Sequence, residues 1–227
     1  MKKAVVLLSG GIDSATTLYW AKQKNYACFC LIFDYGQRHK KEIKSAILIA
    51  KKAKSPYEII KIRLPWKGSS LLDKRLEVPQ RYNVINQKRK NLIPSTYVPA
   101  RNIIFLSFAL SFAEAIGAKA IFIGAHTHDY SDYPDCRIGF FKAFQEIIKE
   151  GTAAGINKKS IKIYTPIINK NKAEIIKLAK KLGVPLELTW SCYHGKRYPC
   201  GKCDSCYFRA KGFQELGIKD PLLVISS

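Results

Sequence analysis

The stretch AVVLLSGGIDS (residues 4–14) decides the fold of this chain. Its apolar run, Ala4–Leu8, predicts a buried strand, and the residues after Asp13 predict a helix. Gly10 and Gly11 can adopt backbone angles that are closed to other residues, and they let a ligand approach the main chain. The flanking serines add hydroxyl donors, and the start of the helix adds unpaired N–H groups. The segment therefore predicts a cradle for nucleotide phosphates, whereas an ordinary strand–turn–helix connection needs only one glycine.

Segments typical of strands and helices alternate along the chain. The predicted strands are 4–8, 27–34, 58–64, 120–124 and 161–167, and the predicted helices are 13–23, 40–54, 101–116, 138–150 and 172–182. Strands that are almost continuously apolar indicate an α/β fold with a doubly wound, mostly parallel sheet that helices cover on both faces. Ligands bind at the carboxyl ends of such strands, where we expect Ser9–Ser14, Asp34–His39 and His126–Cys136 to meet.

The helix over 172–182 has well-defined ends. Asn171 is a predicted N-cap with Glu174 as its capping-box partner. Gly183 stands where a left-handed residue ends a helix, and Pro185 follows it.

The length of 227 residues indicates one ordinary domain with appendages. The net charge of +22, from 39 basic and 17 acidic residues, favours polyanionic partners such as nucleic acid or a phosphate-bearing substrate. The lysines are scattered, however, and scattered lysines usually mean solvated helix faces, so the charge alone is weak evidence for nucleic-acid binding. No apolar stretch approaches the roughly 20 residues that cross a bilayer, and the N-terminus lacks the features of a signal peptide. We therefore expect a cytoplasmic protein without a membrane partner.

Four of the seven cysteines lie close together near the C-terminus: Cys192, Cys200, Cys203 and Cys206. The odd total argues against a disulfide framework. Overlapping C-x-x-C spacings let several thiolates bind one ion, and a four-cysteine set suits tetrahedral zinc. Because four protein ligands leave no open position, we expect one structural Zn²⁺ per chain, with an iron–sulfur cluster as the alternative.

The phosphate motif is not of the Walker A type, because neither Gly-Lys pair is followed by Ser or Thr, and no G-x-G-x-x-G follows a strand. SGGIDS (9–14) resembles instead the PP-loop of the ATP pyrophosphatase superfamily, whose enzymes cleave ATP between the α and β phosphates and leave an adenylate. The resemblance implies that ATP, with Mg²⁺, is surrounded by Leu8, Ser9, Gly10, Gly11, Ile12, Asp13, Ser14, Ala15, Thr16, Thr17 and Leu18.

Nearly the whole chain resembles the 7-cyano-7-deazaguanine synthase family of queuosine biosynthesis. Beyond the PP-loop, the resemblance is carried by FDYGQRH (33–39), YVPARNIIFLS (97–107), YPDCR (133–137), NKAEI (171–175) and WSC…CGKCDSC (190–206). It implies that 7-carboxy-7-deazaguanine and ammonia become the nitrile through an adenylated acid and an amide. It also implies small-molecule substrates, a homodimer and no need for nucleic acid. One departure is Asp132, where the family usually has glycine before YPDC.

Seven side chains near the predicted ligand-binding edge are candidates for catalysis or substrate binding: Arg38, Arg101, Asp129, Asp132, Tyr133, Asp135 and Lys172. The three cations would neutralise phosphate or the substrate carboxylate, unless they form structural ion pairs. The three aspartates would take a proton from ammonia or bind an edge of the deazaguanine. The tyrosine would stack on the ring. The adenylate route needs no nucleophile from Cys136.

We expect a PP-loop catalytic domain over 1–186 and a zinc-binding region over 187–227. Residues 65–100 lack periodicity and predict a flap near the active site, with disorder as the alternative. One rival function is a PP-loop enzyme that modifies tRNA by thiolation or lysine transfer. Thiolation usually needs a reactive cysteine pair, but Cys28 and Cys30 fall in a predicted buried strand, where thiols are inert. A second rival, a zinc-knuckle protein that binds nucleic acid, leaves SGGIDS without a role.

Overall fold

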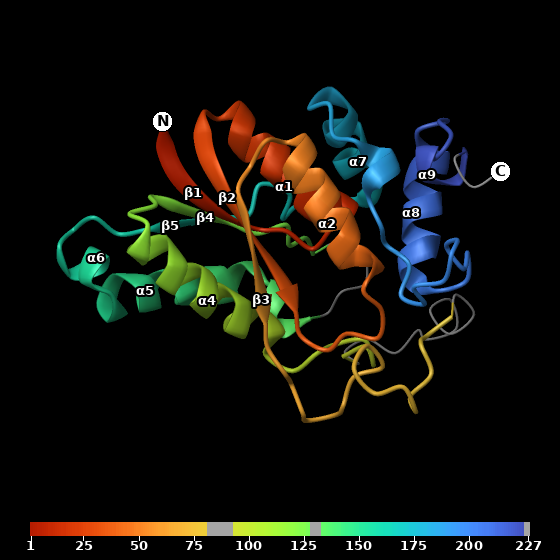
Figure 1. Ribbon diagram of the computed structural model, residues 1–227, viewed down its shortest axis with the longest axis horizontal. Helices are drawn as coiled ribbons and strands as arrows, with labels where there is room; N and C mark the ends of the chain where they lie inside the picture. The colour runs from red at the N-terminus through yellow and green to blue at the C-terminus, as the bar shows by residue number, and fades with distance from the viewer. Residues whose placement is uncertain (81–92, 128–132, 225–227) are drawn as a thin grey trace.

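The computed structural model describes residues 1–80, 93–127 and 133–224, so the predicted site residues Asp129 and Asp132 lie outside the described residues. A five-stranded sheet with helices on both faces forms the body of the molecule (Figure 1). The strands are β1 (Lys2–Leu7), β2 (Tyr26–Asp34), β3 (Tyr57–Lys61), β4 (Ala120–Phe122) and β5 (Lys162–Tyr164). The helices are α1 (Ile12–Gln23), α2 (Lys41–Lys52), α4 (Arg101–Ala115), α5 (Ile138–Gly151), α6 (Ala153–Ile156), α7 (Lys172–Lys181), α8 (Asp204–Glu215) and α9 (Pro221–Val224), with short 3₁₀ turns at Pro134–Cys136 and Leu186–Leu188.

The strand order is β3-β2-β1-β4-β5, and all neighbouring strands run parallel. The chain therefore builds outward from the central β1 to β3, and then returns to the other side of β1 with β4 and β5. The direction reverses between β1 and β4, where ligands bind in doubly wound sheets. The predicted α/β fold is confirmed. The last two strands are shorter than predicted, because the chain leaves the sheet after Phe122 and Tyr164.

Each face of the sheet has its own apolar core. Ala4 and Val6 of β1 pack toward α1, α2 and α7, whereas Val5 and Leu7 pack toward α4 and α5. Successive side chains of a strand point to opposite faces, so a strand covered on both faces needs apolar residues throughout. Figure 1 shows the two helical layers on either side of the sheet. This packing explains why β1 has no polar alternation.

The predicted ends of α7 are confirmed. The Asn171 side chain accepts a hydrogen bond from the Glu174 N–H at 2.9 Å, and the Asn171 N–H donates to Glu174 Oε2 at 2.8 Å. Gly183 takes the left-handed conformation with φ of +71°. This capping fixes the first residue of α7, Lys172, in a defined position.

Helix α8 was not predicted. Its sequence, DSCYFRAKGFQE, has weak apolar periodicity and an internal glycine, so the pattern did not indicate a helix. The structure joins this helix directly to the cysteine motif, with Cys203 as N-cap. At Gly212 a Cβ atom would come within 2.8 Å of Ile176 in α7, and Phe213 belongs to the core under α7. The C-terminal region is therefore packed onto the main body (Figure 1).

Within the described ranges, none of the helices has both the length and the apolar character that crossing a membrane requires.

Candidate active site

The two glycines of the PP-loop have different conformations. Gly10 has φ of +87°, and a Cβ atom there would lie 2.2 Å from the Glu42 carbonyl oxygen and 2.8 Å from the Ala46 nitrogen in α2. Gly11 has φ of −80° and is the N-cap of α1. The expectation that both glycines use angles closed to other residues is therefore wrong for Gly11, because a helix N-cap takes ordinary extended angles. Gly10 alone needs the missing side chain for its angle and for close packing.

Hydroxyl groups brace the turn from inside. Ser14 Oγ donates to the Gly11 carbonyl at 3.1 Å and accepts from the Ser9 N–H at 3.1 Å. The Ser9 and Ser14 hydroxyls are 3.0 Å apart. At Gly124, just after β4, a Cβ atom would come within 2.9 Å of the backbone of Asp13 and Ser14. Sequence reasoning missed Gly124, although a glycine directly after a buried strand is a signal of close backbone approach.

Asp13, Lys172 and His126 meet at the first turn of α1. Lys172 Nζ lies 2.9 Å and 3.0 Å from the two Asp13 carboxylate oxygens, and His126 Nε2 lies 3.3 Å from Asp13 Oδ2. Burial raises the pKa of Asp13, but the charges of Lys172 and His126 outweigh it and hold this pKa well below its usual range. A carboxylate thus stays ionised beside the PP-loop, and Lys172 lies at the loop in an ion pair with Asp13, the alternative that the sequence left open.

The PP-loop opens onto a cavity of about 1390 Å³ at the carboxyl ends of the central strands. The described parts of 65–100 contribute Leu71, Val78 and Thr96 to its wall, and the cysteine-rich region contributes Trp190. Val78 and Trp190 also belong to one small apolar cluster, together with three of the clustered cysteines. Three parts of the chain that are distant in sequence therefore enclose one space.

A second charged group lines this cavity at the start of α4. Arg101 Nη1 is 3.2 Å from the Tyr35 hydroxyl, and its guanidinium lies 5.7 Å from the centre of the Tyr35 ring. Burial raises the pKa of the nearby Glu42 carboxyl to about 7, although the Arg101 charge and a 3.1 Å hydrogen bond from Gln37 Nε2 oppose this shift. Sequence reasoning missed Glu42, for which the only signal is an acid in the first turn of the helix after FDYGQRH. A carboxyl group that titrates near neutrality suits proton transfer.

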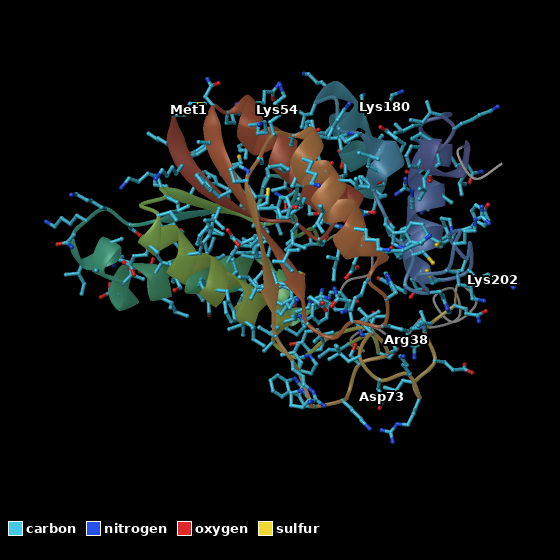
Figure 2. All side chains as sticks on the ribbon, viewed as in Figure 1. Met1, Arg38, Lys54, Asp73, Lys180 and Lys202 are labelled. Carbon is cyan, nitrogen blue, oxygen red and sulfur yellow. The ribbon has the colours of Figure 1, made fainter. Side chains whose placement is uncertain are left out.

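Arg38 lines the cavity, but its guanidinium binds backbone oxygens. Arg38 Nη2 donates to the carbonyls of Asp73 at 3.0 Å and Leu76 at 2.7 Å, and its main-chain N–H donates to the Leu71 carbonyl at 2.9 Å. Figure 2 labels Arg38 and Asp73 in the same lower part of the molecule. This cation therefore holds the predicted flap segment against the body.

Tyr133 also lines the cavity. Its hydroxyl is 2.5 Å from Thr96 Oγ1, and its ring centre is 5.8 Å from that of Tyr97. The YPDC motif and the YVPA motif are thus joined through their tyrosines.

Asp135 lies behind the cavity wall rather than on it. Asp135 Oδ2 accepts a 2.9 Å hydrogen bond from the Asn102 N–H, and Asn102 Nδ2 donates to the Asp135 carbonyl at 3.0 Å and to Cys136 Sγ at 3.3 Å. This buried carboxylate satisfies one of the free N–H groups at the start of α4, where a cap is required. Burial raises the pKa of Cys136 to about 11, so this residue stays a thiol near neutral pH.

The four clustered cysteines can hold a metal ion. The sulfur atoms of Cys192, Cys200, Cys203 and Cys206 all lie within 4.8 Å of one another, and those of Cys200 and Cys206 are 3.9 Å apart. Tetrahedral zinc with Zn–S bonds of about 2.3 Å places sulfur atoms about 3.8 Å apart, so the spacing fits. Backbone N–H groups of His194 and Cys200 point at Cys192 Sγ, which stabilises a thiolate. Figure 2 shows yellow sulfur atoms beside the α8 ribbon.

The cysteine cluster also carries a residue into the cavity. Asp204, the first residue of α8, lines the cavity together with Ser205. Its Oδ1 atom is buried and has no hydrogen-bond partner within the part of the chain that the structure describes. Burial raises the pKa of this carboxyl group.

The chain is similar to known proteins over nearly its whole length. The family model described as "Queuosine biosynthesis protein QueC" matches residues 3–217. A protein of Nostoc punctiforme named 7-cyano-7-deazaguanine synthase is 50% identical over 223 residues, which cover 97% of this chain and 99% of that protein. A protein of the same name from Acetivibrio thermocellus is 51% identical over 223 residues, with 98% and 97% covered.

Among solved structures, a 4-thiouridine synthetase in complex with RNA and bound ATP matches 94% of this chain and 53% of its own, with a TM-score of 0.51 and 17% identity. At that identity the likeness shows the fold alone. The family match spans both the PP-loop and the four cysteines, and the chain therefore belongs to the queuosine biosynthesis protein QueC family.

Proposed function

We propose that this chain is a 7-cyano-7-deazaguanine synthase, an ATP-dependent ligase that joins ammonia to 7-carboxy-7-deazaguanine and delivers the nitrile. The observation that carries the proposal is the identity of about half of all residues, over nearly the full length, with proteins of that name. The braced PP-loop and the large cavity beside it support the same conclusion.

The chemistry accounts for a phosphate-handling site. A carboxylate is a poor electrophile because its leaving group would be oxide. Attack of the carboxylate on the α-phosphate of ATP releases pyrophosphate, and ammonia then displaces AMP to form the amide. The amide oxygen attacks the α-phosphate of a second ATP and releases pyrophosphate and a proton, and loss of AMP and a second proton leaves the nitrile. One pyrophosphate cradle serves both activations.

Different residues at the PP-loop would bind the pyrophosphate, the phosphate charge and Mg²⁺. The turn Ser9–Ser14 and the N–H groups at the start of α1 would hold the pyrophosphate, within the ATP site Leu8–Leu18. Lys172 supplies positive charge at the same place, and the Asp13 carboxylate is an oxygen ligand of the kind that Mg²⁺ prefers. Bound Mg²⁺ would neutralise phosphate charge during adenylation. Activation therefore takes place between α1 and α7.

Glu42 and Arg101 supply the acid–base and anion-binding groups. A carboxyl group with a pKa of about 7 is half ionised near neutral pH, and it is suited to accept a proton from ammonium or from the ammonia adduct. The Arg101 guanidinium is suited to the substrate carboxylate or the α-phosphate. Asp135 fits a positioning role, because it caps the helix that begins with Arg101. Asp129 and Asp132 remain further candidates for the base.

The cysteine cluster is proposed to hold one structural Zn²⁺ per chain. Four thiolates fill a tetrahedral site and leave no position for substrate. Reduced, closely spaced cysteines also favour a cytoplasmic location. The ion would fix the loop that carries Asp204 into the cavity.

A homodimer is proposed from the outer face of α4. This helix is largely apolar, and Ile103 and Phe108 remain 44% and 40% exposed. A helix of this kind usually buries its remaining face against a partner. A second copy of the chain is the partner that we propose, and Phe108→Glu should shift the sedimentation coefficient toward a monomer.

The decisive assay combines the chain with ATP, Mg²⁺, ammonium and 7-carboxy-7-deazaguanine. Nitrile and AMP are measured by chromatography and mass spectrometry, with Ser14→Ala as the inactive control. Absence of both nitrile and substrate-dependent AMP would refute the assignment. Thiolation of tRNA by the same preparation would support the rival PP-loop enzyme.

A further inference from the structure

We propose that the carboxylate of Asp204 recognises the pyrimidine edge of the deazaguanine ring by accepting its N1–H and 2-amino hydrogens. The inference rests on the proposed function, and it assigns to the cysteine-rich region a role in substrate selection. Two adjacent N–H donors match the two oxygens of one carboxylate, which can accept them as parallel, charge-assisted hydrogen bonds.

The position of Asp204 is fixed from both sides. Cys203 precedes it as the N-cap of α8, and Cys206 follows it within the first turn of the helix. These two cysteines belong to the cluster whose sulfur atoms lie within 4.8 Å of one another. The carboxylate is therefore presented to the cavity on a rigid support, as precise recognition requires.

The Asp204 carboxylate has an acceptor to offer. Its Oδ1 atom is buried at the cavity wall, and no described residue donates a hydrogen bond to it. A buried acceptor without a partner costs free energy, which a ligand donor would recover. The site should therefore bind more tightly a ligand that donates an N–H hydrogen bond to this atom.

The other described carboxylates of the cavity wall are differently placed. Asp13 is bound to Lys172, and Glu42 accepts a hydrogen bond from Gln37. Glu77 is exposed to solvent. Asp204 is therefore the best placed of these four to bind a neutral donor pair inside the cavity.

The surroundings of Asp204 favour a flat ring over a free ammonium ion. Tyr133 and Tyr193 line the same cavity as Asp204. Their aromatic faces suit stacking on a bicyclic substrate. The cations that activate the carboxylate, Lys172 and Arg101, belong to other elements. The substrate would then extend from the PP-loop, with its carboxyl group, to Asp204, with its pyrimidine edge.

The test compares two substrates on three enzymes. The substrates are 7-carboxy-7-deazaguanine and the analogue that lacks the 2-amino group. The enzymes are the wild type, Asp204→Asn, and the control Glu215→Gln, which makes the same carboxylate-to-amide change at the exposed end of α8. Both kcat/KM for nitrile formation and Kd from calorimetric titration are measured, together with zinc content and the KM for ATP.

We expect the wild type and Glu215→Gln to prefer the 2-amino substrate by about 10- to 100-fold, the worth of one hydrogen bond to a charged group. In Asp204→Asn the preference should fall to within about threefold, because an amide cannot accept both hydrogens. Its zinc content and its KM for ATP should stay unchanged. If Asp204 had a merely structural role, the substitution would instead weaken the binding and conversion of both substrates equally.

Three results would overturn the inference. The first is a wild type that binds and converts both substrates equally. The second is an Asp204→Asn enzyme that keeps the preference for the 2-amino substrate. The third is an Asp204→Asn enzyme whose main defect is a raised KM for ammonium. The first result needs no variant, so it holds even if Asp204→Asn does not fold. A wild type that forms no nitrile refutes the proposed function, whereas the Kd values still test ring recognition. If the wild type binds neither ring, both proposals fail.

Discussion

Replacing Arg209 with methionine should lower the free energy of unfolding by about 3–5 kcal/mol, the cost of breaking a buried ion pair from one side. Arg209 is 4% exposed, and its guanidinium donates to both oxygens of Asp220, at 2.6 Å and 2.8 Å. It also donates to Thr189 Oγ1 at 2.8 Å and to the Leu186 carbonyl at 3.2 Å. One side chain thus ties α8 to the 3₁₀ turn Leu186–Leu188 and to Thr189, the residue that ends this turn.

The magnitude follows from what the substitution leaves behind. Asp220 is only 8% exposed, so without Arg209 it would be an uncompensated buried charge. Removing both partners, as in Arg209→Met combined with Asp220→Leu, should cost clearly less than the sum of the two single changes, because no charge is stranded.

Urea unfolding of the zinc-loaded protein measures these free energies, and the tryptophan fluorescence of Trp190 reports on this region. Lys211→Met is the matched control, because Lys211 lies on the same helix, is 53% exposed and pairs with Glu215 at 3.7 Å. Its cost should stay below about 1 kcal/mol. A cost below 1 kcal/mol for Arg209→Met, or strictly additive single changes, would contradict the argument.

Further predictions concern the site itself. Gly10→Ala should abolish nitrile formation and destabilise the fold, because the new methyl group would lie 2.2 Å from a backbone oxygen; soluble yield and turnover test this. For the wild type, kcat/KM for ammonium should rise with pH through about 7 as Glu42 ionises, and Glu42→Gln should lose this rise and about 10²-fold in rate. Since the pKa of Glu42 in the folded state lies above the ordinary value of 4.5, its contribution to stability is complete below that value and is lost as pH rises through about 7. Comparing urea midpoints with the Gln variant between pH 5 and 8 checks the sign. Cys203→Ser, or chelation of the native protein, should release zinc and lower the melting temperature, as metal analysis and calorimetry would show. Lys172→Met should raise the KM for ATP at least tenfold with intact zinc content, and an unchanged KM would exclude Lys172 from the phosphate site.

The local sequence was sufficient to predict the features that depend on interactions between nearby residues. A few adjacent residues are enough to identify each of these features. The apolar run before SGGIDS identifies a strand, and the capping box at Asn171 and Glu174 identifies the start of a helix. The glycine at 183 identifies the end of that helix. The four cysteines likewise predict their own cluster, because their spacing already limits their separation.

Residues whose role depends on distant partners were less predictable. Arg38 was expected to meet an anion but binds backbone carbonyls 35 and 38 residues away. Asp135 was expected to serve the chemistry but caps a helix 33 residues before it. Glu42 was not predicted as a site residue, because its raised pKa arises from burial that only the packed structure creates.

The sequence by itself determined the parallel α/β architecture, the PP-loop and the cysteine cluster, because periodicity, glycine conformation and ligand spacing act over a few residues. Only the tertiary structure decided which side chains face one cavity. Lys172 reaches Asp13 across 159 residues of sequence, and α8, which the pattern did not reveal, carries Asp204 to the same space. Such meetings depend on how the helices pack on the sheet, and side-chain periodicity does not encode the distance between two separate elements.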